Sequence, residues 1–203
     1  MELDNCIKER RSVRDFLDKE VNWGTLFEIL ESTTYAPSSG NMQNWAFIIV
    51  RDKKKKEALA QAANGQDFMI KAPVLIVICN RLDRIKRIYG ERGEKLYSIQ
   101  NCAAATQNIL LKAHSLGLST CWVGAFDSDE VTNILKLEKE VQPDSIIALG
   151  YSEENPIMPK REELGNLVYF EDWGNKRKVL EVKEEAKKII KDNFNKIKNK
   201  FKK

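Results

Sequence analysis

Histidine is nearly absent from this sequence, and cysteine never occurs in the paired pattern that binds metals. The 203-residue chain holds one histidine, His114, and four cysteines without a CxxC pair. A zinc site would have to gather scattered ligands, and His114 alone more often lies at a surface or caps a helix than acts as a catalyst. The sequence also lacks a GxSxG elbow, a GxxxxGK[ST] loop and a GxGxxG turn after a strand. These absences argue against hydrolase, nucleotide-hydrolysing and Rossmann sites, so the chemistry would have to come mainly from a cofactor.

Long apolar segments are also missing. No run of 18 apolar residues occurs, so we expect no membrane-spanning helix. The start of the chain, Met1 to Asp4, lacks the basic and then apolar pattern of a signal peptide. We therefore expect a cytoplasmic protein with reduced thiols, in which Cys79 and Cys102 are core residues and Cys121 is a buried strand residue.

Positive charge is concentrated at the end of the chain. The net charge is +4, and residues 183–203 hold nine lysines against three acidic residues, which leaves about −2 for the rest. A basic tail on a nearly neutral body argues against a nucleic-acid-binding domain. The tail also carries an apolar stripe at helical spacing, which predicts packing against the body or a partner subunit, with an anionic membrane as the alternative. The stripe consists of Ile190, Phe194, Ile197 and Phe201.

Hydrophobic residues make up 42% of the whole chain, enough for a substantial core, and the body shows alternating helical and extended patterns. We predict one domain over residues 1–175 and a basic amphipathic helix over 176–203. The four lysines of 53–56 are expected on a solvated helix face, and residues 81–93 as an irregular loop over a site. Helices are predicted at 3–9, 22–33 with Asn22 as N-cap, 53–63, 94–116 and from Asp127, and strands at 47–50, 74–79, 119–124, 145–151 and 167–170.

Two kinds of segment carry candidate function. The stretch APSSGNMQNW (36–45) offers hydroxyl and amide groups on a loop before an apolar strand, which suits the polar edge of a planar ring, although a capped turn is an equal interpretation. Arginines cluster between Arg10 and Arg14, and Lys160 and Arg161 form a second basic pair. Guanidinium groups bind phosphate in bidentate fashion, so the two clusters together would make a phosphate site without a P-loop.

Four segments in order resemble motifs of the FMN-dependent nitroreductase family. They are RRSVRDF (10–16), APSSGNMQNW (36–45), AHSLGLSTCWVG (113–124) and ALGY (148–151), followed by Lys160-Arg161. The resemblance covers roughly residues 3–173. It departs at Asn44, where the family usually has proline before the tryptophan, and this change is expected to relax the loop without removing FMN binding.

The resemblance implies an α+β fold: an α/β/α sandwich with a central mixed, mostly antiparallel sheet, assembled as a homodimer with two FMN sites at the subunit interface. One subunit would contact the phosphate, ribityl chain or pyrimidine edge through Arg10, Arg11, Ser12 and Arg14, with Lys160 and Arg161 completing the phosphate site. Gly124 and Ala125 would bring backbone near the ring, and Gln66 would meet the ribityl chain or ring edge. The other subunit would reach the same flavin through Pro37, Ser38, Ser39 and Asn41.

The implied activity is ping-pong hydride transfer from NADH or NADPH through flavin N5 to a nitroaromatic, quinone or similar acceptor. Arg14 would stabilise the anionic reduced flavin, and no protein nucleophile is needed. Two alternatives remain open. One is another chemistry of the same family, such as flavin fragmentation, dehalogenation or peptide oxidation. The other is a flavin-binding redox sensor or interaction protein with the basic tail as its docking element.

Overall fold

A computed structural model describes residues 1–176, 184–189 and 191. Packing divides the chain into two units, Met1–Ile157 and Met158–Lys203, and each is described by itself. The second unit holds α8 (Leu164–Leu167) and a helical segment over 184–189. The predicted boundary after residue 175 stays a prediction, and the apolar stripe of the tail (Ile190, Phe194, Ile197, Phe201) lies outside the described residues.

The first unit is built on a four-stranded sheet in the order β1-β2-β4-β3. All named strand pairs are antiparallel, and a single parallel bridge joins Ser12 to Thr120. The predicted α+β class with a mixed, mostly antiparallel sheet is therefore confirmed. The strands are β1 (Trp45–Val50), β2 (Val74–Arg81), β3 (Ser119–Val123) and β4 (Val141–Gly150).

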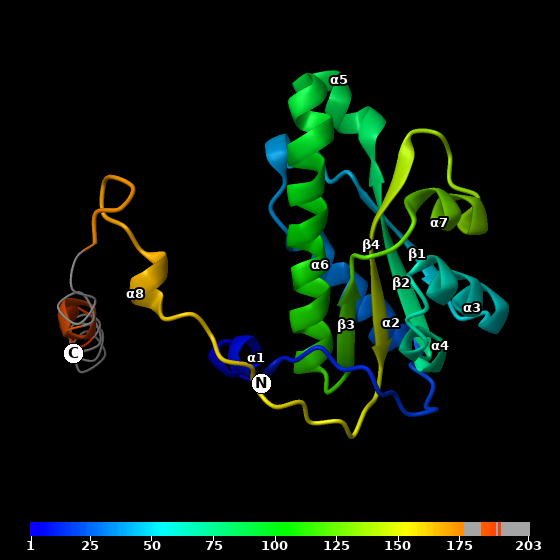
Figure 1. Ribbon diagram of the computed structural model, residues 1–203, viewed down its shortest axis with the longest axis horizontal. Coiled ribbons are helices and arrows are strands. Elements are labelled where there is room, and N and C mark those ends of the chain that lie inside the picture. Colours follow the sequence, from blue (N-terminus) through cyan, green and yellow to red (C-terminus); the bar gives the residue numbers. More distant parts are fainter. Residues whose placement is uncertain (177–183, 190, 192–203) are drawn as a thin grey trace, which may run out of the picture. The chain divides into compact units, whose positions relative to one another are not determined.

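Helices cover both faces of this sheet, as Figure 1 shows. One hydrophobic cluster lies between the sheet and α3, α4 and α7, and the other between the sheet and α2 and α6. This arrangement is the predicted α/β/α sandwich. The helices of the first unit are α1 (Leu3–Glu9), α2 (Trp23–Glu31), α3 (Lys53–Ala62), α4 (Phe68–Lys71), α5 (Leu82–Arg92), α6 (Ser98–Ser115) and α7 (Ser128–Leu135), with short turns η1 (Ser32–Tyr35), η2 (Ser39–Asn41) and η3 (Gly93–Tyr97).

The continuous apolar run of β2 follows from this double cover. Leu75 and Val77 pack into the α3–α4–α7 cluster, whereas Val74, Ile76 and Ile78 pack into the α2–α6 cluster. Side chains alternate between the two faces of a strand, so a strand covered on both faces needs an apolar residue at every position. All five of these side chains are fully buried.

Local capping explains where two of the predicted helices begin. Asn22 Oδ1 accepts a hydrogen bond from the Thr25 amide at 2.8 Å, and Asp127 Oδ1 accepts one from the Glu130 amide at 2.8 Å. Each bond satisfies a donor that the first helical turn leaves unpaired. The predicted N-caps of α2 and α7 are confirmed.

Two predicted elements differ in the structure. Residues 81–93 are not an irregular loop, because α5 spans most of them and buries Leu82 and Ile85 against the body. Residues 167–170 form no strand; the Phe170 amide instead donates to the Asn175 carbonyl at 2.8 Å within a turn. Short segments of this kind take their structure from the tertiary contacts that they meet, which periodicity alone does not report.

Lys56 also differs from its prediction as part of a solvated lysine run. Its side chain is buried, and its Nζ donates to the carbonyls of Ile70 at 3.0 Å and Ala72 at 2.7 Å. These carbonyls lie at the end of α4, where a helix leaves its last acceptors unpaired. Burial lowers the pKa of Lys56, and the nearby Asp18 carboxylate partly opposes this shift. Lys56 therefore ties α3 to α4.

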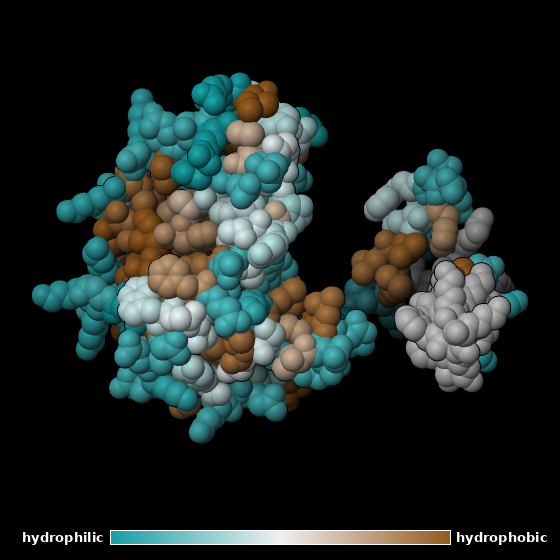
Figure 2. All heavy atoms as spheres, turned by 180° about the vertical axis from the view of Figure 1, so that it is seen from behind, coloured by the Kyte–Doolittle hydropathy of each residue, from teal (hydrophilic) through white to brown (hydrophobic). Residues whose placement is uncertain are grey.

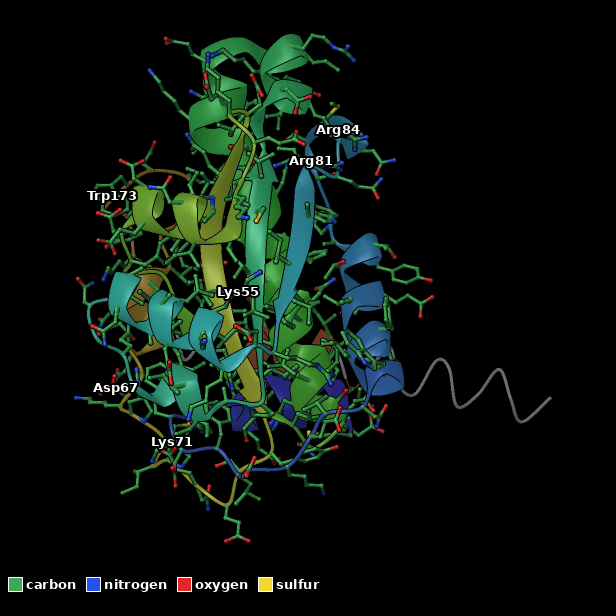
Figure 3. All side chains as sticks on the ribbon, turned by 90° about the vertical axis from the view of Figure 1, so that its right-hand side faces the viewer. Lys55, Asp67, Lys71, Arg81, Arg84 and Trp173 are labelled. Carbon is green, nitrogen blue, oxygen red and sulfur yellow. The ribbon has the colours of Figure 1, made fainter. Side chains whose placement is uncertain are left out.

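Replacing Lys56 tests this tie. Lys56→Ala should lower the free energy of unfolding by about 1–3 kcal/mol, because one buried and one partly buried carbonyl lose their donor. Chemical denaturation measures the change. The matched control is Lys55→Ala on the same helix, where the side chain is exposed (Figure 3) and the expected change is within about 0.5 kcal/mol. Equal stabilities of the two variants would contradict the assignment.

Candidate functional site

The arginine segment, residues 10–14, follows α1 and runs beside the start of β3. The Val13 amide donates to the Thr120 carbonyl at 3.0 Å, and the Leu17 amide donates to the Tyr151 carbonyl at 2.8 Å. Val13 is buried while Ser12 and Arg14 are exposed. The backbone of this segment is thus attached at two points, to the edge strand β3 and to the residue after β4, and it exposes the side chains of Ser12 and Arg14.

Glu154 provides a third attachment, and nothing in the sequence pattern singles it out. Its Oε2 accepts hydrogen bonds from the amides of Arg14 at 2.8 Å and Asp15 at 2.9 Å. Ser152 supports the same turn, since its hydroxyl donates to the Asp15 carbonyl and accepts from the Glu154 amide at 2.9 Å. A carboxylate that binds two successive amides holds the backbone that carries Arg14.

Arg10 and Arg11 line a small cavity of about 90 Å³ together with His114, Ser119 and Glu154. Nη1 of Arg11 donates to the carbonyls of Lys8 at 2.6 Å and Arg10 at 2.7 Å, so this guanidinium caps the C-terminal end of α1. Burial lowers the pKa of His114; Glu9 opposes this shift, and the two arginines add to it. Burial thus favours the neutral form of this partly buried imidazole.

Arg14 points toward a different group of residues. Its guanidinium carbon lies 5.8 Å from the centre of the Phe68 ring. Two residues before this ring, Gln66 Nε2 donates to the carbonyls of Ala63 at 2.9 Å and Ala125 at 3.3 Å. The structure therefore brings the predicted residue Gln66 to the exposed turn of Gly124 and Ala125, which follows β3.

The second predicted group, Pro37 to Asn41, lies on a tightly wound loop. Asn41 and Gln43 have φ angles of +57° and +45°, and Gly40 has +54°. Each non-glycine residue in this left-handed region costs about 1–2 kcal/mol, so surrounding contacts must hold the conformation. Within the loop, the Gln43 amide donates to Ser38 Oγ at 3.2 Å, and Gln43 Nε2 donates to Asn41 Oδ1 at 2.9 Å.

Gly40 also lies close to a side chain of α5. A Cβ atom built there would lie 2.3 Å from the Tyr89 hydroxyl of α5. Helix α5 therefore lies directly against the loop.

Asn44 does not relax this loop, contrary to the expectation from its replacement of proline. Its side chain is fully buried and hydrogen-bonds to Asn80 and Asn101, and Asn101 in turn accepts from the amide of Ser39. A proline at this position would offer none of these bonds. The loop is held from inside the core.

The loop around Ser39 and the segment of Arg10 and Arg11 contact α6 at different points along its length. Ser39 is attached at Asn101, whereas the cavity beside Arg10 and Arg11 is lined by His114. Thirteen residues separate these two positions, which at 1.5 Å per residue is about 20 Å along the helix. Within one chain, the structure does not bring the loop to the arginines.

The remaining candidates are placed as follows. Lys160 and Arg161 are exposed residues of the second unit, so their part in a phosphate site stays a prediction. All four cysteines are free and buried. Burial raises the pKa of Cys79 to about 11 and also raises the pKa values of Cys102 and Cys121, so these thiols stay protonated at neutral pH.

Among the described residues, no group of three side chains is placed to hold a metal ion. The same part of the chain contains no helix that is long and apolar enough to cross a membrane. What the exposed segments offer is cationic and neutral hydrogen-bonding groups, which are suited to a phosphate and to the polar edge of a ring.

Comparisons with known proteins agree with this geometry. Residues 7–66 and 62–151 match the model of the nitroreductase family. The chain is 30% identical over 176 residues to the FMN reductase (NAD(P)H) of Bacillus subtilis, an alignment that covers 78% of this chain and 71% of that protein. It is 32% identical over 189 residues to a protein named NADH dehydrogenase from Thermus thermophilus, covering 80% of this chain and 92% of the relative. The solved structure of NfrA1 nitroreductase from B. subtilis superposes with a TM-score of 0.77 at 25% identity, over 85% of this chain and 75% of that one.

The role of Glu154 can be tested without any ligand. In Glu154→Ala, the amide protons of Arg14 and Asp15 should exchange with solvent severalfold faster, because their shared acceptor is gone. Glu154→Gln keeps one acceptor oxygen and should have a smaller effect. Nuclear magnetic resonance measures the exchange, with the exposed neighbour Glu153→Ala as the control. Unchanged exchange in Glu154→Ala would refute the attachment.

Proposed function

We propose that this chain, which belongs to the nitroreductase family, is an FMN-dependent oxidoreductase that uses NADH or NADPH to reduce a nitroaromatic, a quinone or a similar electron-poor acceptor. The observation that carries this proposal is the family match over residues 7–151, which spans both groups of candidate residues. The names of relatives, among them FMN reductase and NADPH nitroreductase, support the cofactor and the electron donor.

The residues present fit FMN. A phosphate carries nearly two negative charges, and the segment from Arg10 to Arg14 supplies arginines on a backbone attached at three points. When bound, FMN supplies the redox chemistry by accepting and passing on hydride. The protein residues would bind, orient and provide charge: Arg14 would stabilise negative charge at the pyrimidine edge, and Gly124 and Ala125 would bring backbone amides near the ring.

A homodimer is part of the proposal, because one chain separates the two halves of the site. The loop around Ser39 and the arginine segment are attached about 20 Å apart along α6. A flavin that contacts both groups would therefore take the arginines from one subunit and the loop from another.

Exposed apolar surface supports this assembly. Leu3, Ile7 and Phe27 are more than half exposed. Figure 2 shows hydrophobic atoms gathered on the face of the first unit that carries α2. A groove of about 760 Å³ is lined by Phe27, Trp45 and Phe47, and also by Arg81 and Arg84, which Figure 3 labels. Large apolar patches of this kind mark association surfaces. The proposed location is cytoplasmic, where NAD(P)H is available and free thiols stay reduced.

The function is tested with the full chain and FMN. Protein incubated with FMN and then desalted should be yellow, and anaerobic NADH or NADPH should bleach it. Addition of a quinone should then give steady-state oxidation of the nicotinamide. Protein that stays colourless after incubation would reject the proposal. Bound flavin without turnover would instead favour a flavin-binding sensor.

Mixed dimers test the shared site. Arg14→Ala and Asn41→Ala homodimers should each bind FMN more weakly, and for Arg14 the loss of a charged hydrogen bond of about 1.5–3 kcal/mol raises Kd roughly ten- to a hundredfold. A heterodimer of the two variants, isolated through two affinity tags, should bind one FMN with the affinity of the unmodified protein, because both changes fall in the other site.

The matched control pairs Arg14→Ala with Arg10→Ala. Both residues belong to the same half, so every site in this heterodimer stays altered and no tight binding is expected. If the first heterodimer also showed no tight binding, each site would lie within one chain.

A further inference from the structure

Three buried amide side chains form a chain of hydrogen bonds from the middle of the fold to the loop around Ser39. Asn44, Asn80 and Asn101 are at most 4% exposed, and they belong to the residue before β1, to β2 and to α6. Asn44 Nδ2 donates to Asn80 Oδ1 at 2.7 Å, and Asn101 Nδ2 donates to Asn44 Oδ1 at 2.7 Å. The last amide ends at the loop, where Asn101 Oδ1 accepts from the Ser39 amide at 3.0 Å and from its hydroxyl at 3.3 Å.

The direction of these bonds sets the orientation of Asn101. Asn44 Nδ2 donates to Asn80 Oδ1 and to the Ser98 carbonyl at 3.2 Å, with a longer contact to Cys102 Sγ at 3.7 Å. Asn44 therefore turns its oxygen toward Asn101, which must present its NH₂ group there and its own oxygen to Ser39. If the Asn101 amide were flipped, its oxygen would face Asn44 Oδ1 and its NH₂ group would face the Ser39 amide. Such unsatisfied buried polar groups are strongly unfavourable.

The loop needs such support, because Gly40 and Asn41, the two residues that follow Ser39, lie in the left-handed region. Conformations of this kind persist only where surrounding contacts determine them. The bond from Asn101 reaches the backbone of Ser39 directly, so it acts on the part of the loop that the proposed function places against the flavin.

We propose that Asn101 is a positioning residue for the FMN site: it holds the Ser39 backbone amide in place, and Asn44 and Asn80 fix the orientation of its side chain. This inference rests on the proposed function for the identity of the ligand. The hydrogen bond between Asn101 and the Ser39 amide, and its effect on the loop, do not depend on FMN.

The matched pair for the test is Asn101→Ala and Asn108→Ala. Both asparagines lie on α6, and Asn108 Nδ2 donates to the Ser32 carbonyl at 2.9 Å, away from the Ser39 loop. Asn101→Ala should raise the Kd for FMN about tenfold, the change that a loss of about 1.4 kcal/mol produces. Asn108→Ala should leave this Kd within about twofold, whatever it does to stability, since it removes no contact to the loop.

Hydrogen exchange of the Ser39 amide in FMN-free protein gives a readout that does not depend on the flavin. Exchange should be faster in Asn101→Ala and unchanged in Asn108→Ala. If Asn101→Ala does not fold, Asn80→Ala takes its place. In that variant Asn44 keeps its bond to the Ser98 carbonyl, and the expected changes in Kd and exchange have the same direction but are smaller.

The outcomes separate the two proposals. Unmodified protein that binds FMN, with equal Kd values for the Asn101 and Asn108 variants, would overturn the positioning role alone. Unmodified protein that does not bind FMN would overturn the proposed function and with it the role toward FMN, and faster Ser39 exchange in Asn101→Ala would then still establish the hold on the loop. A selective rise in Kd together with selective loss of protection at Ser39 would support the inference.

Discussion

Burial of β2 on both of its faces is the constraint on which the structure depends. A strand with no exposed face needs a helical layer on each side and a hydrogen-bonded neighbour at each edge. The chain meets these needs with β1 and β4 at the edges, α6 on one face and α3 on the other. Most candidate site residues lie in the loops and at the ends of the strands, and the polar side chains that remain inside, such as Asn80 on β2, are hydrogen-bonded.

Helix α6 sets the second constraint, because its rigid backbone fixes the distance between the two points at which the candidate groups contact it. Ser39 is attached at Asn101, and the cavity beside Arg10 is lined by His114 further along the same helix. The two groups therefore keep their separation whatever their side chains do. In the proposed function, a flavin that contacts both groups would take one group from each of two chains, and cofactor binding would then be linked to assembly.

The polar contacts that hold the site were the least predictable part of it. Lys56 looked like one member of a solvated run, yet it binds two carbonyls of a neighbouring segment. Nothing in the sequence singled out Glu154, yet it binds the backbone of Arg14. Asn44 looked like a loosened proline position, yet it is fully buried. Each role depends on partners distant in sequence, and local spacing carries no information about such partners.

The sequence by itself determined the pattern of apolar runs, the caps at Asn22 and Asp127 and the two motif segments, because these features depend on neighbours within a few residues. These features were enough to predict most of the helices and strands, and the resemblance to the nitroreductase family implied the α/β/α sandwich. Only the tertiary structure decided that α5 lies against Gly40, that Gln66 meets Ala125 and that the loop is held through Asn101. Such contacts join segments far apart in the chain, and they exist only once the packed core has fixed where each loop begins and ends.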